Sequence, residues 1–402
     1  MLTFEYKARD LKSNKIVHST VRATSEREAG KLLMDRDLVP LNIAAEGSGK
    51  GPLDSIKNRV STKDRIIFIR QLATLINAGL PLSKSLVTAQ DQTQSKALKA
   101  VVQDVVARVE GGATLADAFS HHKEFDELFI ALVAAGEVSG TLDKSLERIA
   151  DQQEKDAEIA GKVKGALVYP IIVLVVIVGV VVFMLTTVVP QIDNLYKSLN
   201  QTLPILTSAL VAVASFIQNF WYAIILALVV GGFYIKRYLA TDGGRRKLDA
   251  IKLNIPLFGV MFRKLYMARF TRTGQTLLNS GVPMLDMLKI AANSSGNVHV
   301  KKSILNASEK VKTGKGLAES LQREDYILPL VPQMISIGEE SGTTDQMMGK
   351  AATFYENELD NAIKSIATAI EPLLMVVLAV VAGGMVGAIL LPIYQLVGNN
   401  SI

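Results

Sequence analysis

The octapeptide GEVSGTLD at residues 136–143 returns almost unchanged as GEESGTTD at residues 338–345, displaced by 202 residues. The same displacement aligns LINAGLPL at 75–82 with LLNSGVPM at 277–284, and no gap is needed over more than 120 residues. Single residues that coincide are Phe68 with Phe270, Arg70 with Arg272, Gly112 with Gly314, Pro170 with Pro372 and Pro190 with Pro392. Similarity at a fixed displacement indicates a repeated structural unit. We call residues 61–190 copy 1 and residues 263–392 copy 2.

Each copy runs into an uncharged segment long enough to cross a membrane. Residues 171–189 end copy 1, residues 373–391 end copy 2, and neither segment contains a charged residue. A third uncharged segment, residues 205–235, lies between them and is interrupted by Gln218 and Asn219. A helix needs about 20 apolar residues to span a bilayer. The predicted membrane helices are residues 167–190, residues 205–235 with the spanning part at about 217–237, and residues 372–396.

The flanking charges predict the orientation of these helices. Residues 236–264 carry eight Lys or Arg and two Asp, a net charge of +6 that equals the formal net charge of the whole chain. The loop 191–204 contains only Asp193 and Lys197 as charged residues. Because basic residues stay on the cytoplasmic side, we expect both copies inside and both the loop 191–204 and the tail 397–402 outside. The basic stretch then predicts contact with anionic lipid rather than with nucleic acid.

The sequence predicts an all-α membrane protein with a small N-terminal α+β unit. Apolar residues recur at helical spacing in both copies, which indicates two tandem homologous cytoplasmic helical bundles. The predicted bundles are residues 61–166 and 236–371, preceded by a ββαβ unit at 1–45 and a linker at 46–60. The charged stretch 142–170 forms a stalk of about 35–40 Å if it is one continuous helix.

The repeated octapeptide has two interpretations that the sequence leaves open. In one it is only a corner between two helices, where glycine serves a positive φ or a close approach of the backbone. In the other, Glu137 and Glu339 contact another domain, protomer or partner, and we predict this outcome for Glu→Gln, which should leave the fold intact and abolish assembly. The motif residues are Gly136, Glu137, Ser139, Gly140 and Asp143 in copy 1, and Gly338, Glu339, Ser341, Gly342 and Asp345 in copy 2.

Two further features concern the membrane helices. Pro170 and Pro372 stand where the chain enters the membrane, and proline predicts a bend there. Gly383 and Gly387 in the last helix have the small-xxx-small spacing that permits close packing of membrane helices.

Motifs for catalysis and metal binding are missing from the sequence. There is no cysteine, the four histidines have no metal-ligand spacing, and GSGKG at 47–51 lacks the pattern of a phosphate-binding loop. His121 and His122 are interpreted as solvated surface residues. We therefore predict no catalytic residue, no cofactor and no metal site. A transporter subunit is disfavoured because the predicted spans carry no ionisable residue, and a receptor is disfavoured by the short outer loop.

With its two octapeptides, NAGLPL with NSGVPM, the YP and EP dipeptides before the membrane, and the FEYKARD leader, the chain resembles the type II secretion F-domain family. These are inner-membrane platform proteins of type IV pilus and type II secretion machines, and the resemblance covers essentially the whole chain. It implies a bacterial inner-membrane protein and a homo-oligomer. The implied partners are a hexameric cytoplasmic assembly ATPase, major and minor pilins and other inner-membrane components. Thr344 departs from the family pattern, which has Leu there. A pilus platform is the leading hypothesis and a secretion platform the alternative.

Overall fold

The computed structural model describes residues 2–10, 16–23, 26–34, 38–45, 60–198, 204–256 and 258–399. The chain divides into two compact units, one made of residues 1–61 and 94–100 and the other of residues 62–93 and 101–402. The predicted linker at 46–60 lies almost wholly outside the described residues.

The described residues of the N-terminal segment form three strands and one helix. They are β1 (Leu2–Asp10), β2 (Ile16–Ala23), α1 (Glu26–Met34) and β3 (Leu38–Ala45). The sheet order is β2-β1-β3, and β1 pairs antiparallel with both neighbours. Val21, Ala23 and Leu33 are buried, which gives this small sheet and its helix an apolar centre.

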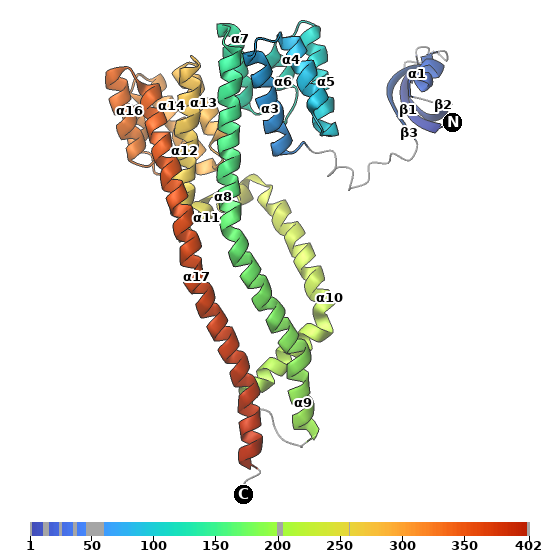
Figure 1. Ribbon diagram of the computed structural model, residues 1–402, viewed down its shortest axis with the longest axis vertical. Helices are drawn as coiled ribbons and strands as arrows, with labels where there is room; N and C mark the ends of the chain where they lie inside the picture. Colours follow the sequence, from blue (N-terminus) through green and yellow to red (C-terminus); the bar gives the residue numbers. More distant parts are fainter. Residues whose placement is uncertain are drawn as a thin grey trace. The chain divides into compact units, whose positions relative to one another are not determined.

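Both copies are helical bundles whose elements follow the same displacement as the sequence. Copy 1 contains α3 (Thr62–Asn77), α4 (Leu82–Gln92), α5 (Lys96–Glu110), α6 (Leu115–Ser120) and α7 (Glu127–Ser139). Helix α11 (Asp242–Asn254) precedes copy 2. The helices of copy 2 are α12 (Phe258–Asn279), α13 (Met284–Ser294), α14 (Val298–Lys312), α15 (Leu317–Gln322) and α16 (Leu330–Ser341). The bounds of α13, α14 and α15 are those of α4, α5 and α6 plus 202, so the duplication extends to the helix ends (Figure 1).

Repeated turn residues explain why the helices end at matching places. Gly79 and Gly281 adopt φ values of +85° and +79°, a conformation that costs a residue with a Cβ atom. Prolines follow at the N-cap positions of α4 and α13, where a missing N–H is tolerated. The turn between the first and second helices therefore has the same structure in both bundles.

Within the part of the chain that the structure describes, three helices are long and apolar enough to cross a membrane, as predicted. The first is α8 (Leu142–Phe183), which continues through the π-helical turn η1 (Met184–Val188) into α9 (Val189–Ser198). The second is α10 (Ile205–Leu239), and the third is α17 (Thr344–Asn399). Figure 1 shows α8 and α17 leaving the two bundles on the same side.

The loop predicted at 191–204 is shorter than expected, because helix α9 continues to Ser198. Val189, Ile192 and Tyr196 recur at helical spacing and are all buried, which stabilises the helix beyond Pro190. The helix α10 is kinked at Phe220 (φ −120°, ψ 16°), immediately after the polar pair that interrupts its sequence. The Gln218 Nε2 atom donates a hydrogen bond of 3.2 Å to the carbonyl of Thr186 in η1.

The prolines and glycines singled out in the membrane helices lie inside continuous helices. Helices α8 and α17 both continue through Pro170 and Pro372, so neither proline ends its helix. A Cβ atom added at Gly383 or Gly387 would meet no heavy atom of the described chain within 4 Å. The packing role predicted for these two glycines therefore stays a prediction.

Candidate functional site: two corners and the contact between the copies

The two octapeptides form the same helix corner in both copies. Gly140 ends α7 with φ +70°, and Gly342 ends α16 with φ +69°. In each corner the amide of the residue immediately before the next helix closes the turn, from Thr141 N to Gly136 O at 2.9 Å and from Thr343 N to Gly338 O at 2.8 Å. This left-handed C-cap satisfies the last carbonyls of the helix.

The first glycine of each octapeptide permits a close approach of the next helix. A Cβ atom at Gly136 would lie 2.6 Å from Ser145 Oγ and 3.1 Å from the Cα of Leu142. A Cβ atom at Gly338 would lie 2.6 Å from the Cα of Thr344. A larger residue at either position would force its neighbours to shift, which agrees with the corner interpretation.

The glutamates of the octapeptides bind backbone amides within their own copy. The Glu137 carboxylate accepts hydrogen bonds from Leu115 N at 2.5 Å and Ala116 N at 2.9 Å. The Glu339 carboxylate accepts from Leu317 N at 2.6 Å and Ala318 N at 3.1 Å. These amides begin α6 and α15, where N–H groups have no partner inside the helix and negative charge is stabilised.

In the described chain both glutamates thus bond inside their own bundle, and their contact with another domain or a partner stays a prediction. Each carboxylate bridges the end of one helix to the start of another in the same bundle. Ser139 and Ser341 also bond locally, each donating from Oγ to a carbonyl four residues earlier at 2.7 Å. Asp143 and Asp345 lie in the first turns of α8 and α17, where acidic side chains stabilise a helix start.

A second repeated feature, which we call the arginine clamp, is an arginine of the first bundle helix that binds a glutamate of the stalk helix. The repeat aligns Arg70 with Arg272, but the sequence alone assigned these residues no role. Arg70 on α3 binds Glu154 on α8 through two hydrogen bonds of 2.7 and 2.6 Å. Arg272 on α12 binds Glu356 on α17 through two of 2.8 and 2.7 Å. The sequence did contain a sign of this pair, because both the arginine and the glutamate recur after 202 residues.

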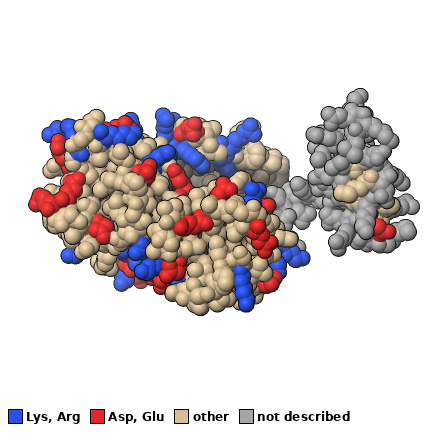
Figure 2. Space-filling view, turned by 90° about the horizontal axis from the view of Figure 1, so that it is seen from above, with Lys and Arg blue, Asp and Glu red and all other residues tan. Residues whose placement is uncertain are grey.

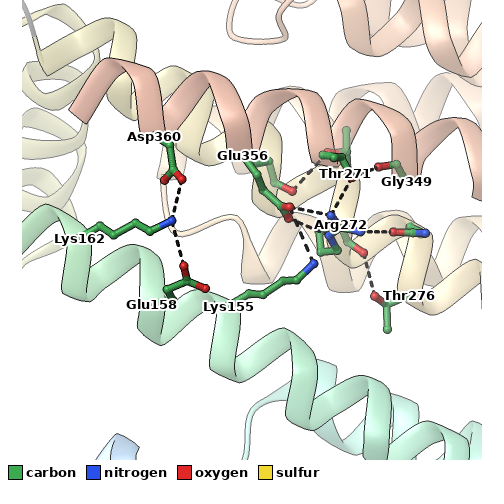
Figure 3. Close-up of polar contacts among 12 residues, drawn as sticks. Lys155, Glu158, Lys162, Thr271, Arg272, Thr276, Gly349, Glu356 and Asp360 are labelled. Carbon is green, nitrogen blue, oxygen red and sulfur yellow. Dashed lines mark hydrogen bonds and ion pairs between the residues drawn. The ribbon is translucent and has the colours of Figure 1, made fainter. Parts of the chain in front are cut away.

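The two copies meet along their stalks. Lys162 on α8 binds Glu158 of its own helix at 2.9 Å and Asp360 on α17 at 2.6 Å, and Glu158 and Asp360 are equivalent positions of the repeat (Figure 3). Ile159, Val163 and Ala166 of α8 pack on a buried cluster contributed by α12 and α17. The members of that cluster are Met261, Leu359, Ile363 and Ile366. The stalk parts of α8 and α17 are thus joined by apolar packing, with ion pairs at the edge of the contact.

The copies also meet through their bundles. The Arg148 Nη1 atom of α8 donates to the carbonyl of Asn279 at 2.9 Å and to Ser280 Oγ at 3.1 Å. The Asn293 Nδ2 atom on α13 donates to Glu127 at the start of α7 at 2.5 Å. In this way α7 and α8 of copy 1 contact α12 and α13 of copy 2.

A cavity of about 290 Å³ opens beside this contact, with walls from α3, α7, α8 and α12. It is lined by both polar and apolar side chains, among them Gln152, Asp156 and Arg269. Burial raises the pKa of the Asp156 carboxyl, and the Arg269 guanidinium at 3.6 Å only partly opposes this shift. The cavity is small and bears a single ion pair between the copies.

Two of the sequence expectations concern metal ligands and the exposure of histidine. Three or more His, Cys, Asp or Glu side chains that might share a metal ion do not come together among the described residues. His122 differs from its predicted exposure, because its side chain is only 16% exposed and bonds Asp104 at 3.0 Å. Basic and acidic side chains are interspersed over the face in Figure 2.

Comparison with known proteins places these features in context. The sequence model described as "Type II secretion system (T2SS), protein F" matches twice, at residues 68–190 and 270–392, which are again 202 residues apart. The type IV pilus assembly protein PilC of Thermus thermophilus is 38% identical over 406 residues, which cover 100% of both chains. PilC of Myxococcus xanthus is 39% identical over 340 residues, 84% of this chain and 82% of that protein. The type II secretion system protein F of Vibrio cholerae is 31% identical over 407 residues, covering 100% of this chain and 99% of that one.

Proposed function

The chain belongs to the type II secretion system protein F family, and from this membership we propose that it is the inner-membrane platform protein of a type IV pilus. In this role it couples a cytoplasmic assembly or retraction ATPase to the insertion or extraction of pilin subunits and performs no catalysis itself. Relatives named type IV pilus assembly proteins that match over most or all of the chain support the assignment to pili.

The observation that carries the proposal is the continuity of each bundle with its own membrane helix. Helix α8 extends from the corner at Thr141 through the predicted membrane boundary to Phe183, and α17 does the same from Thr344 to Asn399. A continuous helix transmits displacement and rotation along its length. The pairing of α8 with α17 through Lys162 and Asp360 makes the two helices respond together.

Orientation and partners form part of the proposal. The +6 stretch at 236–264 supports cytoplasmic bundles and contact with anionic lipid. The bundles would then face the ATPase, and the apolar surface of α8, α10 and α17 would face lipid and the major and minor pilins. A reporter fused after Asn200 should read as external, and reporters fused after Gly51 and Lys301 should read as cytoplasmic. A cytoplasmic signal from Asn200 would overturn the orientation.

A platform of a type II secretion system is the second candidate. Protein F of Pseudomonas aeruginosa is 35% identical over 98% of this chain, which lies close to the identities of the pilus relatives. Deleting the gene in its own organism separates the candidates. We expect loss of surface pili with normal export of folded enzymes, and the reverse result would establish the secretion role.

The coupling itself is tested by breaking one stalk. Gly161 lies in α8 between corner and membrane, and a Cβ atom added there meets no heavy atom within 4 Å. Gly161→Ala should therefore be tolerated, whereas Gly161→Pro removes a helix hydrogen bond and costs roughly 3 kcal/mol of helix stability. At equal membrane levels, we expect Gly161→Pro to abolish pili and Gly161→Ala to retain them. Normal piliation with Gly161→Pro would refute transmission through α8.

The absence of catalysis has its own test. The purified full chain should not hydrolyse nucleotide, and it should change the hydrolysis rate of its cognate ATPase. Hydrolysis by the chain alone, after removal of contaminating enzymes, would refute the platform role.

A further inference from the structure

The contact between the two copies joins different faces. Copy 1 contributes α7, and copy 2 contributes α13 and α12 to this part of the contact. The reverse pair, α16 of copy 2 with α4 of copy 1, makes no comparable contact among the described helices. Figure 1 shows α16 and α4 on opposite sides of the pair of bundles. A contact between unlike faces of like units leaves one face of each kind unpaired.

The paired faces enclose a groove of about 540 Å³ between α7 and α13. Ala135 and Val138 line it from α7, and Asp286 and Lys289 line it from α13. The groove is mostly apolar, and hydrogen bonds such as Asn293 to Glu127 close its edge.

The same positions on the unpaired faces carry complementary side chains. On α16 the equivalents of Ala135 and Val138 are Ile337, 51% exposed, and Glu340. On α4 the equivalents of Asp286 and Lys289 are Lys84 and Val87, and Val87 is 38% exposed. Each unpaired face thus offers one exposed apolar side chain and one exposed charge, and the two charges, on Glu340 and Lys84, are of opposite sign. Charge pairs of this kind set the register of an interface.

The stalks repeat this complementarity independently. Within the chain, Lys162 of copy 1 binds Asp360 of copy 2 at 2.6 Å. The position in copy 2 that corresponds to Lys162 is Lys364 on α17, which is exposed. The position in copy 1 that corresponds to Asp360 is Glu158 on α8. Opposite charges thus meet again when copy 2 of one chain stands beside copy 1 of another.

We propose that α16 of one protomer packs against α4 of a second copy of this chain, in the arrangement that α7 makes with α13 inside each chain. Because α8 and α17 leave their bundles on the same side, repeating this relation keeps every protomer in one membrane (Figure 1). Contacts between unlike faces propagate until they close, so the assembly is a ring or an open array of protomers. This inference depends on contacts and charges and is independent of the pilus assignment.

Cysteine cross-linking of the full chain in membranes tests the proposal, because the natural sequence has no cysteine. Ile337→Cys and Val87→Cys are placed on separate, differently tagged protomers. After oxidation or treatment with a short bis-maleimide, we expect a cross-linked dimer that carries both tags. Ala135→Cys with Lys289→Cys in one chain is the matched control, which should cross-link within the chain.

The single variants decide the geometry. Either variant expressed alone should give no dimer, and a dimer from one of them alone would mean that like faces meet, which overturns the proposal. Absence of the mixed dimer while the control pair cross-links would also overturn it. Lys84→Glu or Glu340→Lys should lower the yield of the mixed dimer roughly two- to fivefold, the range of an exposed ion pair. Combining both reversals should restore the yield, and failure of that rescue would refute the assigned register.

Discussion

The two copies fill the centre of the same bundle with different side chains. Copy 1 packs Phe119 against Phe125 and Phe129 with ring centroids 4.4 and 4.9 Å apart. The equivalent positions of copy 2 are Leu321, Ile327 and Val331, all buried. Copy 2 instead buries methionines, with Met267, Met287 and Met348 fully enclosed. Cores of different composition therefore support the same helix arrangement when total volume and pattern are kept.

The corners do not vary in this way. Both keep glycine at the close approach, glutamate at the amides of the short helix and glycine at the positive φ. An apolar core tolerates exchange because neighbouring side chains can repack. A left-handed backbone or a carboxylate between two amides has few substitutes, so these positions repeat while the core changes.

The largest expected effect concerns the close approach. Gly338→Ala would force the backbone at Thr344 apart, because the nearest atom to the new Cβ is that Cα at 2.6 Å. Gly136→Ala would meet the Ser145 side chain first. We expect both to lose about 1–3 kcal/mol, with Gly338→Ala at the upper end. Thermal unfolding of the full chain, with hydrogen exchange assigned to each copy, measures the difference.

A second substitution sharpens this contrast. Ser145→Gly should partly rescue Gly136→Ala, because it removes the side-chain atoms at 2.6 and 2.8 Å. Gly161→Ala, in open space, should not destabilise. Equal losses in the two copies without any rescue by Ser145→Gly would show that the backbone limits both corners.

The next effect concerns the glutamates. In Glu137→Gln and Glu339→Gln the amide oxygen still accepts one N–H, but the NH₂ group faces the other donor. Hydrogen bonds to charged groups contribute about 1.5–3 kcal/mol, and we expect the larger loss for Glu137, which is less exposed than Glu339. Hydrogen exchange at the first amides of α6 and α15 measures it.

Glu340→Gln is the matched control, because Glu340 stands beside Glu339 with only a 3.4 Å contact to Ser336. Its effect should stay within about 0.5 kcal/mol. Unchanged exchange in Glu137→Gln together with lost pili would return these residues to the role of partner contacts and contradict a local capping role.

A smaller effect is expected at the left-handed glycines. Gly140→Ala and Gly342→Ala place a Cβ atom at φ +70° and +69°, where no neighbouring atom lies within 4 Å. Only backbone strain remains, which costs about 1–2 kcal/mol. Because the geometry is the same, melting of the two variants should agree, and a difference of more than about 0.5 kcal/mol would show that the corners are not equivalent.

Sequence reasoning was strongest where residues act through their own backbone. The glycines and prolines that repeat at 202 residues end and begin the helices, and uncharged runs indicated three membrane helices. It was weakest where a side chain reaches a distant element. Nothing near Glu137 indicates that the amides of Leu115 and Ala116 lie beside it, and Ile192 with Tyr196 was too short a pattern to predict α9.

The smallest expected effect compares two carboxyls on one helix that respond to pH in opposite directions. The Arg70 guanidinium holds the pKa of Glu154 below its usual value, whereas burial raises the pKa of Asp156. A lowered folded-state pKa gives stability that is present above the unfolded pKa, about 4.3 for Glu, and lost as pH falls through the folded one. A raised folded-state pKa gives the opposite sign, because the folded protein then binds the proton more tightly than the unfolded chain.

Acidification from neutral pH should therefore act on Asp156 first. The contact of α8 with α12 should gain stability as pH falls through the raised pKa of Asp156. The contact of α8 with α3 should lose stability below about pH 4.3, where the unfolded chain begins to bind a proton at Glu154, and the loss is complete once pH has passed below the lowered pKa of the folded state. Asp156→Asn removes the first slope and leaves the second, whereas Glu154→Gln does the reverse. Protection factors of the α8 amides between pH 7 and pH 3.5 measure both slopes. Since Glu154 holds copy 1 together and Asp156 faces copy 2 through Arg269, only Asp156→Asn should change the pH dependence of the contact between the copies. A change in that contact from Glu154→Gln would mean that the clamp inside copy 1 and the contact between copies are one coupled network.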